Sequence, residues 1–120
     1  MHKFAWMVLF CLFAPLTVSF LSARAKEQSI GSVSVANLPK EVRQTIALIK
    51  NGGPYPYKKD GSVFGNFERH LPPHERGYYK EFTVPTPGSR DRGTRRIISG
   101  KAGELYYTDD HYQSFKRVLE

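Results

Sequence analysis

The sequence predicts an α+β fold, with one main N-terminal helix packed on a twisted antiparallel sheet. Three observations predict it. One amphipathic segment spans residues 37–53, several short runs of β-branched and aromatic residues follow it, and turn residues separate these runs. One helix followed by a succession of short strands is typical of an antiparallel sheet covered by a helix on one face.

The first 25 residues of the 120-residue chain resemble an export signal. Lys3 precedes an apolar run over residues 4–21, and an A-x-A pattern ends at Ala25, where a signal peptidase would cut. A membrane anchor is the alternative, because the run is almost long enough to span a bilayer. Pro15 interrupts that run, however. We therefore expect a signal peptide over residues 1–25, one domain over residues 26–120, and secretion to the medium or periplasm.

The domain itself would be basic and free of disulfides. The full chain has a formal net charge of +7, and removal of residues 1–25, which contain Lys3 and Arg24, would leave a net charge of +5. The single cysteine, Cys11, also lies in the leader, so the domain must be stabilised by its core. A positive surface suits nucleic acid or an anionic envelope, although charge alone does not distinguish these from simple solubility.

The segment NLPKEVRQTIALIKNGG, residues 37–53, predicts the helix. Pro39 suits its first turn, Glu41 lies at the positive end of the dipole, and Gly52 is a natural stop. An apolar stripe at i, i+4 and i+7 is assigned to the core and consists of Val42, Ile46 and Ile49. Residues 26–34 before the helix are polar, and we expect them to be loosely structured.

Short strands are expected after a turn-rich segment containing Pro54, Pro56 and Asp60-Gly61. The expected strands are residues 63–64, 77–84, 95–99 and 104–110, with 114–120 closing the chain. The segment PTPGSRDRG, residues 85–93, is expected to form a loop. In GYYKEFTV, residues 77–84, a period of two places Glu81 with Tyr79 and Thr83 on the face opposite Lys80.

Two arginines are expected near Glu81. Arg92 and Arg96 share a face if their strand is extended throughout, with Gly93 as a possible bend and Arg95 pointing away. Taken alone, Glu81 with two arginines is explained by a cross-strand ion-pair cluster.

The histidines are less informative on their own. Asp109 and Asp110 favour the protonated form of His111, which in isolation resembles a surface histidine. His70 and His74 resemble exposed loop residues, and the histidine spacings predict no metal site and no cofactor.

A carboxylate, a histidine and two arginines together nevertheless match the needs of RNA cleavage through the 2′-hydroxyl. That reaction requires a base for the 2′-hydroxyl proton, an acid for the departing 5′-oxygen, and cations for the charge that develops on the phosphate. It needs no metal ion.

These motifs resemble the small bacterial guanyl-specific ribonucleases, the barnase group, which have the microbial ribonuclease fold. The similarity runs over residues 33–115 and is carried by NLPKEV, GPYPYKKDGSVFGNFE, GYYKEFTVPTPGSRDRGTRRII and YYTDDHYQSF. The resemblance implies a metal-independent endoribonuclease that cuts single-stranded RNA 3′ to guanosine. A 2′,3′-cyclic phosphate would form first and then be hydrolysed.

The resemblance also implies catalytic roles, residue by residue. Glu81 in YYKEFTV matches the general base, and His111 in TDDHY matches the general acid. Arg92 and Arg96 in RDRGTRR match the arginines that bind the scissile phosphate and stabilise the transition state. Tyr112 matches a tyrosine that lines the phosphate or base site.

Guanine recognition is implied for FGNFERHLP, residues 64–72. Glu68 matches the carboxylate that accepts from guanine N1–H and the 2-amino group, Asn66 matches an asparagine that shapes the turn, and Phe64 matches an aromatic residue of the pocket. Phe67 stands where relatives often have arginine, and we expect it to stack on the base or cover it. The disulfide of some relatives is also missing.

Two alternatives differ in class or role. The domain could be a non-catalytic basic module that binds anionic polymers, or the nuclease could serve as an antibacterial toxin. The partners expected are single-stranded RNA and an acidic, barstar-like inhibitor, although Phe67 in place of arginine weakens the basis for an inhibitor. We expect a monomer with no membrane association after signal cleavage.

Overall fold

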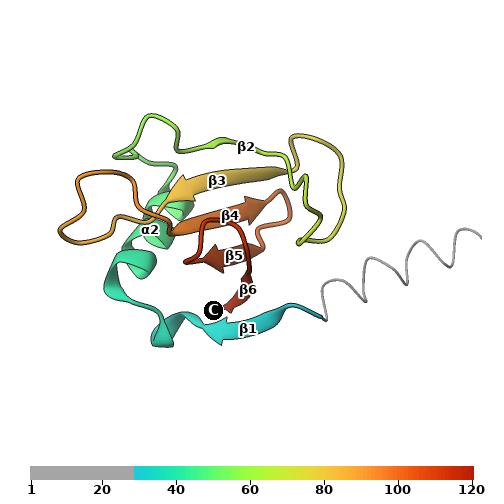
Figure 1. Cartoon of the computed structure of the whole chain (residues 1–120), viewed down its shortest axis with the longest axis horizontal. Helices are drawn as coiled ribbons and strands as arrows, with labels where there is room; N and C mark the ends of the chain where they lie inside the picture. The colour runs from blue at the N-terminus through green and yellow to red at the C-terminus, as the bar shows by residue number, and fades with distance from the viewer. Residues whose placement is uncertain (1–28) are drawn as a thin grey trace, which may run out of the picture.

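The computed structural model describes residues 29–120 (Figure 1). The expected signal peptide lies outside the described residues. Within residues 29–120, no helix has the length and apolar character needed to cross a membrane.

The domain is a six-stranded sheet with one α-helix, which confirms the predicted α+β class. The strands follow the spatial order β1-β6-β5-β4-β3-β2, and every neighbouring pair is antiparallel except β1 and β6. Their bounds are β1 Gly31–Ser34, β2 Ser62–Phe64, β3 Tyr79–Thr83, β4 Arg96–Gly100, β5 Leu105–Thr108 and β6 Lys116–Leu119.

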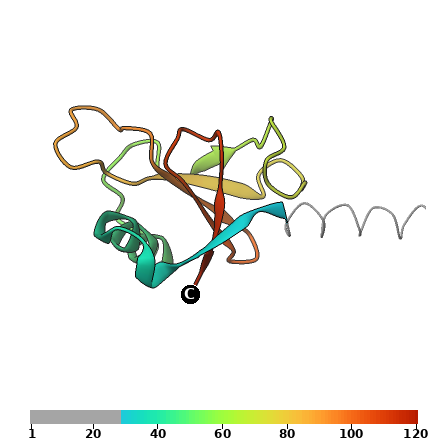
Figure 2. The same ribbon diagram turned by 60° about the horizontal axis from the view of Figure 1, so that its bottom comes forward.

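The helix α2, Lys40–Asn51, covers one face of the sheet (Figures 1 and 2). A short 3-10 turn, Val35–Asn37, precedes it, and Pro39 is its N-cap residue. It ends at Gly52, which adopts a left-handed φ of 76° that glycine accommodates without strain. The predicted apolar stripe faces the sheet, with Val42 and Ile46 buried and Ile49 at the margin.

The first strand corrects the expectation that residues 26–34 are loosely structured. Residues Gly31–Ser34 pair in parallel with β6, and Val33 lies opposite Val118. Val33 also packs against the core beneath the helix. The segment GSVS has one apolar side chain, so its local pattern predicts no strand. Pairing with β6, more than 80 residues away in the chain, supplies the backbone hydrogen bonds.

Apolar clusters lie on both faces of the sheet. The cluster under the helix includes Val42, Ile46, Val84 and Ile97, all of which are buried. The cluster on the opposite face consists of Leu71, Tyr79, Ile98, Tyr106 and Phe115. Tyr79 and Val84 therefore lie on opposite faces, as the alternation in residues 77–84 predicts. Glu81 shares the face of Tyr79, which the helix does not cover.

Candidate active site

The centre of the sheet brings polar side chains to its uncovered face. Register pairs Thr83 on β3 with Arg96 on β4, and Arg96 in turn with Thr108 on β5. Glu81 lies two residues before Thr83, so it projects from the same face. Three adjacent strands of the sheet, β3, β4 and β5, thus hold these groups.

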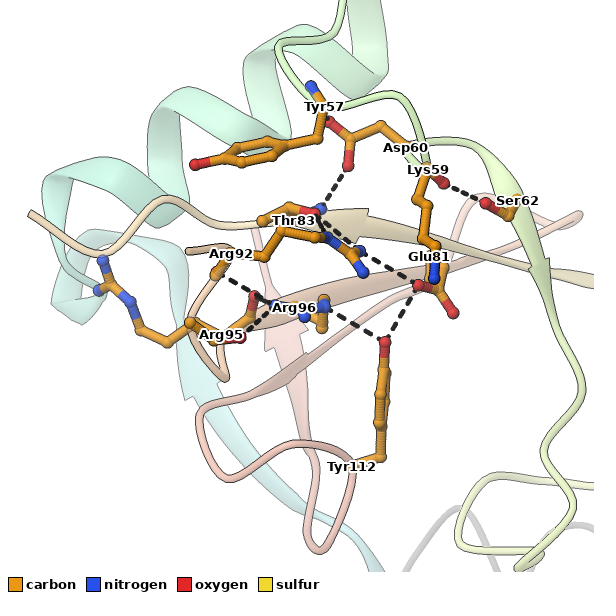
Figure 3. A network of polar contacts seen from close by, with 11 residues as sticks. Tyr57, Lys59, Asp60, Ser62, Glu81, Thr83, Arg92, Arg95, Arg96 and Tyr112 are labelled. Atoms are coloured by element: carbon orange, nitrogen blue, oxygen red, sulfur yellow. Dashed lines mark hydrogen bonds and ion pairs between the residues drawn. The ribbon is translucent and has the colours of Figure 1, made fainter. Parts of the chain in front are cut away.

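The carboxylate of Glu81 is at the centre of this group (Figure 3). Its Oε1 accepts a hydrogen bond from the Tyr112 hydroxyl at 3.0 Å and lies 3.4 Å from Nη2 of Arg92. The Glu81 side chain is 17% exposed, so it remains open to a ligand. Figure 3 also shows the Lys59 side chain extending toward Glu81 from the loop before β2.

Tyr112 bridges Glu81 and Arg96. Its hydroxyl accepts from Nε of Arg96 at 3.2 Å while donating to Glu81. Burial, and then the negative charge of Glu81, raise the pKa of Tyr112 above its ordinary value. The phenol therefore keeps its proton at neutral pH and acts as a donor to the carboxylate.

Arg96 is almost fully buried, with an exposed fraction of 2%. Its Nη1 donates to the backbone carbonyls of Arg95 at 2.8 Å and Gly93 at 3.1 Å. These bonds fix the guanidinium, whose Nε is linked to the Glu81 carboxylate through the Tyr112 hydroxyl. Arg95 points to the other face, where it pairs with Glu41 of the helix at 3.7 Å, as the alternation predicts.

The segment before β4 bends at Gly93, so the extended alternative for residues 92–96 is wrong. Gly93 has a φ of +65°, and a Cβ there would lie 2.6 Å from Oγ1 of Thr86. Glycine is the residue that tolerates both conditions. The bend lets Arg92 return toward Glu81 from outside the strand.

Thr83 and Asp60 orient Arg92, and the sequence analysis assigned neither to the site. Oγ1 of Thr83 accepts from Nε and Nη2 of Arg92 at 3.1 and 2.9 Å. The backbone N–H of Thr83 donates to Oδ1 of Asp60 at 2.8 Å. Asp60 carries only a turn signal in the sequence, and a threonine in a strand is unremarkable. No local pattern identifies them.

We predict that Thr83→Val lowers kcat/KM for RNA cleavage about tenfold, the order expected from one lost hydrogen bond to a charged group. Valine keeps the shape of threonine but removes the acceptor that holds Arg92. Steady-state kinetics would be measured beside urea unfolding. The control is Thr45→Val, because Thr45 is also buried but bonds to the helix backbone. Equal activity losses in both variants would contradict a specific role for Thr83.

His111 lies beside Tyr112 in the loop between β5 and β6. Its ring centroid is 5.0 Å from that of Tyr112, and its backbone N–H donates to Thr94 O at 3.0 Å. The hydroxyl of Thr94 donates to Asp109 O at 2.8 Å, so the histidine loop is fastened to the arginine segment at two points. Glu81 and His111 therefore flank the same tyrosine.

The backbone of this loop is strained where the histidine sits. His111 and Tyr112 have φ values of +58° and +73°, a region that non-glycine residues seldom adopt. Asp110 stabilises the turn by accepting from the Ser114 N–H and hydroxyl at 3.0 and 2.5 Å and from the Thr108 hydroxyl at 2.8 Å. The Ser114 hydroxyl is the largest of the influences that lower the pKa of Asp110 to about 2.

We predict that Asp110→Asn lowers the Tm by about 4 °C near pH 6, because one solvent-screened set of hydrogen bonds is weakened. Because the pKa of Asp110 is lower in the folded state, its carboxylate stabilises the protein at pH values above its ordinary pKa of 3.8. That stabilisation is lost as the pH falls toward about 2. The Tm difference between wild type and variant should therefore shrink between pH 4 and pH 2. Calorimetry across this range tests it, and a constant difference would contradict the assignment.

A pocket of about 180 Å³ adjoins the polar group formed by Glu81, Arg92, Arg96 and Tyr112. It is lined by Phe64, Asn66, Phe67, Glu68, His70 and Tyr112. The Phe64 ring stacks on Tyr112 with centroids 5.2 Å apart, and these two rings give the pocket an aromatic wall. Because Tyr112 also bonds to Glu81, the pocket and the polar group around Glu81 share one residue.

Asn66 shapes the loop that forms the pocket. It adopts a φ of +52°, and its side-chain amide bonds both backbone groups of Leu71, at 3.0 and 3.1 Å. Leu71 is fully buried, so this clamp attaches the loop to the core. Glu68 follows in the same loop with its side chain 66% exposed.

Phe67 stands at the mouth of the pocket and is 84% exposed. Its ring lies over Gly65, where a Cβ would approach ring atoms to 2.5 Å. The guanidinium of Arg76 lies 5.7 Å from the centre of the ring. A larger residue at 65 would displace this exposed ring.

The site residues from the sequence thus fall into two adjoining groups. Glu81, Arg92, Arg96 and Tyr112 are in direct contact, with His111 beside Tyr112. The remaining four line the pocket. Across residues 29–120, no three His, Cys, Asp or Glu side chains are grouped so as to hold a metal ion.

A family model described as ribonuclease matches residues 22–119. The chain belongs to the ribonuclease family. Among similar ribonucleases, guanyl-specific ribonuclease St from Saccharopolyspora erythraea is 54% identical over 87 residues, which are 72% of this chain and 86% of that protein. Guanyl-specific ribonuclease Sa from Kitasatospora aureofaciens is 53% identical over 89 residues, covering 73% of this chain and 93% of that protein.

Solved ribonuclease structures share the fold. A crystal structure of ribonuclease Sa2 with guanosine-2′-cyclophosphate has a TM-score of 0.73 and 49% identity, covering 75% of this chain and 96% of that one. Another, of ribonuclease Sa2 with 3′-GMP, has a TM-score of 0.71 and 47% identity, covering 75% and 97%. The described part of this ribonuclease therefore corresponds to nearly the whole of those domains.

Proposed function

We propose that this ribonuclease cleaves single-stranded RNA on the 3′ side of guanosine through a 2′,3′-cyclic phosphate. The observation that carries the proposal is the position of Tyr112, which bonds to the Glu81 carboxylate and also lines the pocket. A base in the pocket would therefore present its own ribose and 3′-phosphate to Glu81. The guanyl-specific names of the relatives and the guanosine ligand of ribonuclease Sa2 support this substrate.

In the first step, Glu81 acts as the general base. It takes the proton from the 2′-hydroxyl, and O2′ attacks the adjacent phosphorus. His111 donates a proton to the 5′-oxygen as the P–O5′ bond breaks, which leaves a 2′,3′-cyclic phosphate and a free 5′-hydroxyl. Tyr112 and Arg92 both contact Oε1 of Glu81, so Oε2 is the oxygen available to the substrate.

Arg92 and Arg96 stabilise the extra charge on the phosphate in the transition state. Both guanidinium groups are held by fixed protein acceptors, Thr83 for Arg92 and backbone carbonyls for Arg96. Preorganised cations of this kind need little rearrangement during the reaction. In the second step His111 and Glu81 exchange roles, and water opens the cyclic phosphate to a 3′-phosphate.

Glu68 would select guanine. A carboxylate accepts two parallel hydrogen bonds, and guanine offers two neighbouring donors in N1–H and the 2-amino group. Adenine has no donor at N1 and no 2-amino group, so it leaves the carboxylate without partners. Phe64 and Tyr112 contact the base through their rings, and Phe67 covers the opening.

Digestion of a mixed-sequence RNA, followed by mapping of the ends, tests the proposal. Cuts should follow guanosine, early products should end in a 2′,3′-cyclic phosphate, and 2′-deoxyguanosine at one position should abolish cleavage there. Unchanged cleavage at the deoxy position would overturn the mechanism. Cuts after all four bases would overturn the specificity.

We also propose that the chain is exported, on the strength of the leader-like residues 1–25, and acts as a monomer. Mass spectrometry of secreted protein should find an N-terminus at Lys26, whereas an intact leader in the cell fraction would contradict export. An acidic, barstar-like inhibitor is the expected protein partner, because it would complement the cations around Glu81.

A further inference from the structure

His70 lies beside the carboxylate that we assign to guanine. Its Nε2 is 3.1 Å from Oε2 of Glu68, and its ring lines the same pocket. The ring centroid is also 6.2 Å from that of Phe115, in the cluster on the uncovered face of the sheet. The histidine side chain is 39% exposed, whereas the carboxylate that it contacts is 66% exposed.

A turn in the loop brings these two residues together. Arg69 between them has a φ of +58°, and its N–H donates to Asn66 O at 3.0 Å. The chain therefore reverses at Arg69, and residues 68 and 70 project toward the same space. The clamp from Asn66 to Leu71 closes the turn, so the pairing follows from the conformation of the loop.

We propose that His70 is a positioning residue for guanine recognition, which holds the Glu68 carboxylate in the orientation that binds the base. The inference rests on the proposed role of Glu68. A carboxylate pairs with two guanine donors only when its plane matches the edge of the base. An exposed glutamate samples several rotamers, and binding must otherwise restrict them. The N–H of His70 at Oε2 restricts these rotamers before the substrate arrives, so less conformational entropy is lost on binding.

The contact leaves the carboxylate able to bind guanine. Each carboxylate oxygen can accept two hydrogen bonds, so His70 occupies only one of the sites on Oε2. Among the described residues, no donor bonds to Oε1. Both oxygens therefore keep a free site for the N1–H and 2-amino groups. The imidazole can donate from Nε2 whether it is neutral or protonated, so this hydrogen bond to Glu68 does not require a charge on His70.

A surface pair with a merely structural role predicts no change in KM or kcat when His70 is replaced. Exposed ion pairs contribute little to stability, so loss of His70 should leave the fold intact in either case. A positioning role predicts a change in KM alone, because Glu68 touches the base and not the reacting phosphate. The kinetic constants, together with stability, therefore separate the two interpretations.

The test compares His70→Val with His70→Gln on a guanosine dinucleotide. Valine removes the donor, and we expect KM to rise about fivefold with kcat unchanged, the effect of one solvent-screened hydrogen bond to a charge. Glutamine keeps an N–H donor and should restore KM to within about twofold of wild type. His74→Val is the matched control, because that loop histidine stacks on Tyr78 away from the pocket and should leave KM unchanged.

Glu68→Ala completes a double-mutant cycle and separates the two hypotheses. Glu68→Ala should raise KM strongly, and adding His70→Val should then have no further effect. If Glu68→Ala leaves KM unchanged, the proposed guanine site itself is wrong. If Glu68→Ala raises KM but His70→Val does not, or if His70→Val has the same effect with and without Glu68, the positioning role alone is overturned.

Discussion

Glu81→Gln is expected to lower kcat/KM for cleavage after guanosine by roughly 10²–10⁴, the range that general base catalysis supplies. The amide keeps the size of the carboxylate but cannot take the 2′-hydroxyl proton. Its oxygen can still accept from the Tyr112 hydroxyl, so the geometry of the site should persist. Steady-state rates on a guanosine dinucleotide and urea unfolding measure the two effects.

The same variant separates a nuclease from a basic module that only binds RNA. RNA affinity should be retained or increased in Glu81→Gln, because the substitution removes a negative charge from beside the arginines. Glu75→Gln is the control, because Glu75 is 68% exposed and lies near Lys101 instead of the catalytic arginines. A loss smaller than tenfold in Glu81→Gln would remove Glu81 from the role of base.

His111→Gln is the second variant with a large expected effect. It should reduce RNA cleavage by roughly 10²–10⁴, because the departing 5′-oxygen would lose its proton donor. A substrate with a p-nitrophenol leaving group needs no such donor, since that group departs as a stable anion. Most of the loss should therefore disappear when guanosine 3′-(p-nitrophenyl phosphate) replaces RNA.

Glu81→Gln supplies the contrast for this experiment. A better leaving group does not replace the base, so its defect should persist on the p-nitrophenyl substrate. His74→Gln controls for the loss of a histidine outside the catalytic group. Equal defects of His111→Gln on both substrates would instead assign His111 to substrate binding or to the fold of its loop.

Local periodicity explains how much of the fold the sequence predicts. The stripe through Val42 and Ile46 predicts the helix and its buried face, and alternation through residues 77–84 predicts the face on which Glu81 lies. The strand at Gly31–Ser34 escapes this approach, because its stability comes from a partner at the other end of the chain. Tertiary pairing there outweighs a weak local preference.

In the candidate site, too, local pattern identifies some residues but not the contacts that orient them. Glu81 and Arg96 can be grouped from strand pattern and charge, and the resemblance supplies their roles and that of Arg92. The contacts that orient them cannot be read locally. Arg92 reaches Glu81 only because Gly93 bends the chain, and Thr83 holds Arg92 through a bond between separate segments. His70 looks like an ordinary loop residue until the turn at Arg69 places it against Glu68.

The shared tyrosine has a consequence for how the enzyme would discriminate between substrates. In the proposed mechanism, one face of Tyr112 meets the base in the pocket, and its hydroxyl bonds to Glu81, the proposed general base. A base of the wrong shape, unlike a guanine that is only held less tightly, would tilt that ring and disturb the proton acceptor along with it. An incorrect nucleotide would then react slowly even when it saturates the enzyme, so selectivity would be exercised during turnover as well as on entry.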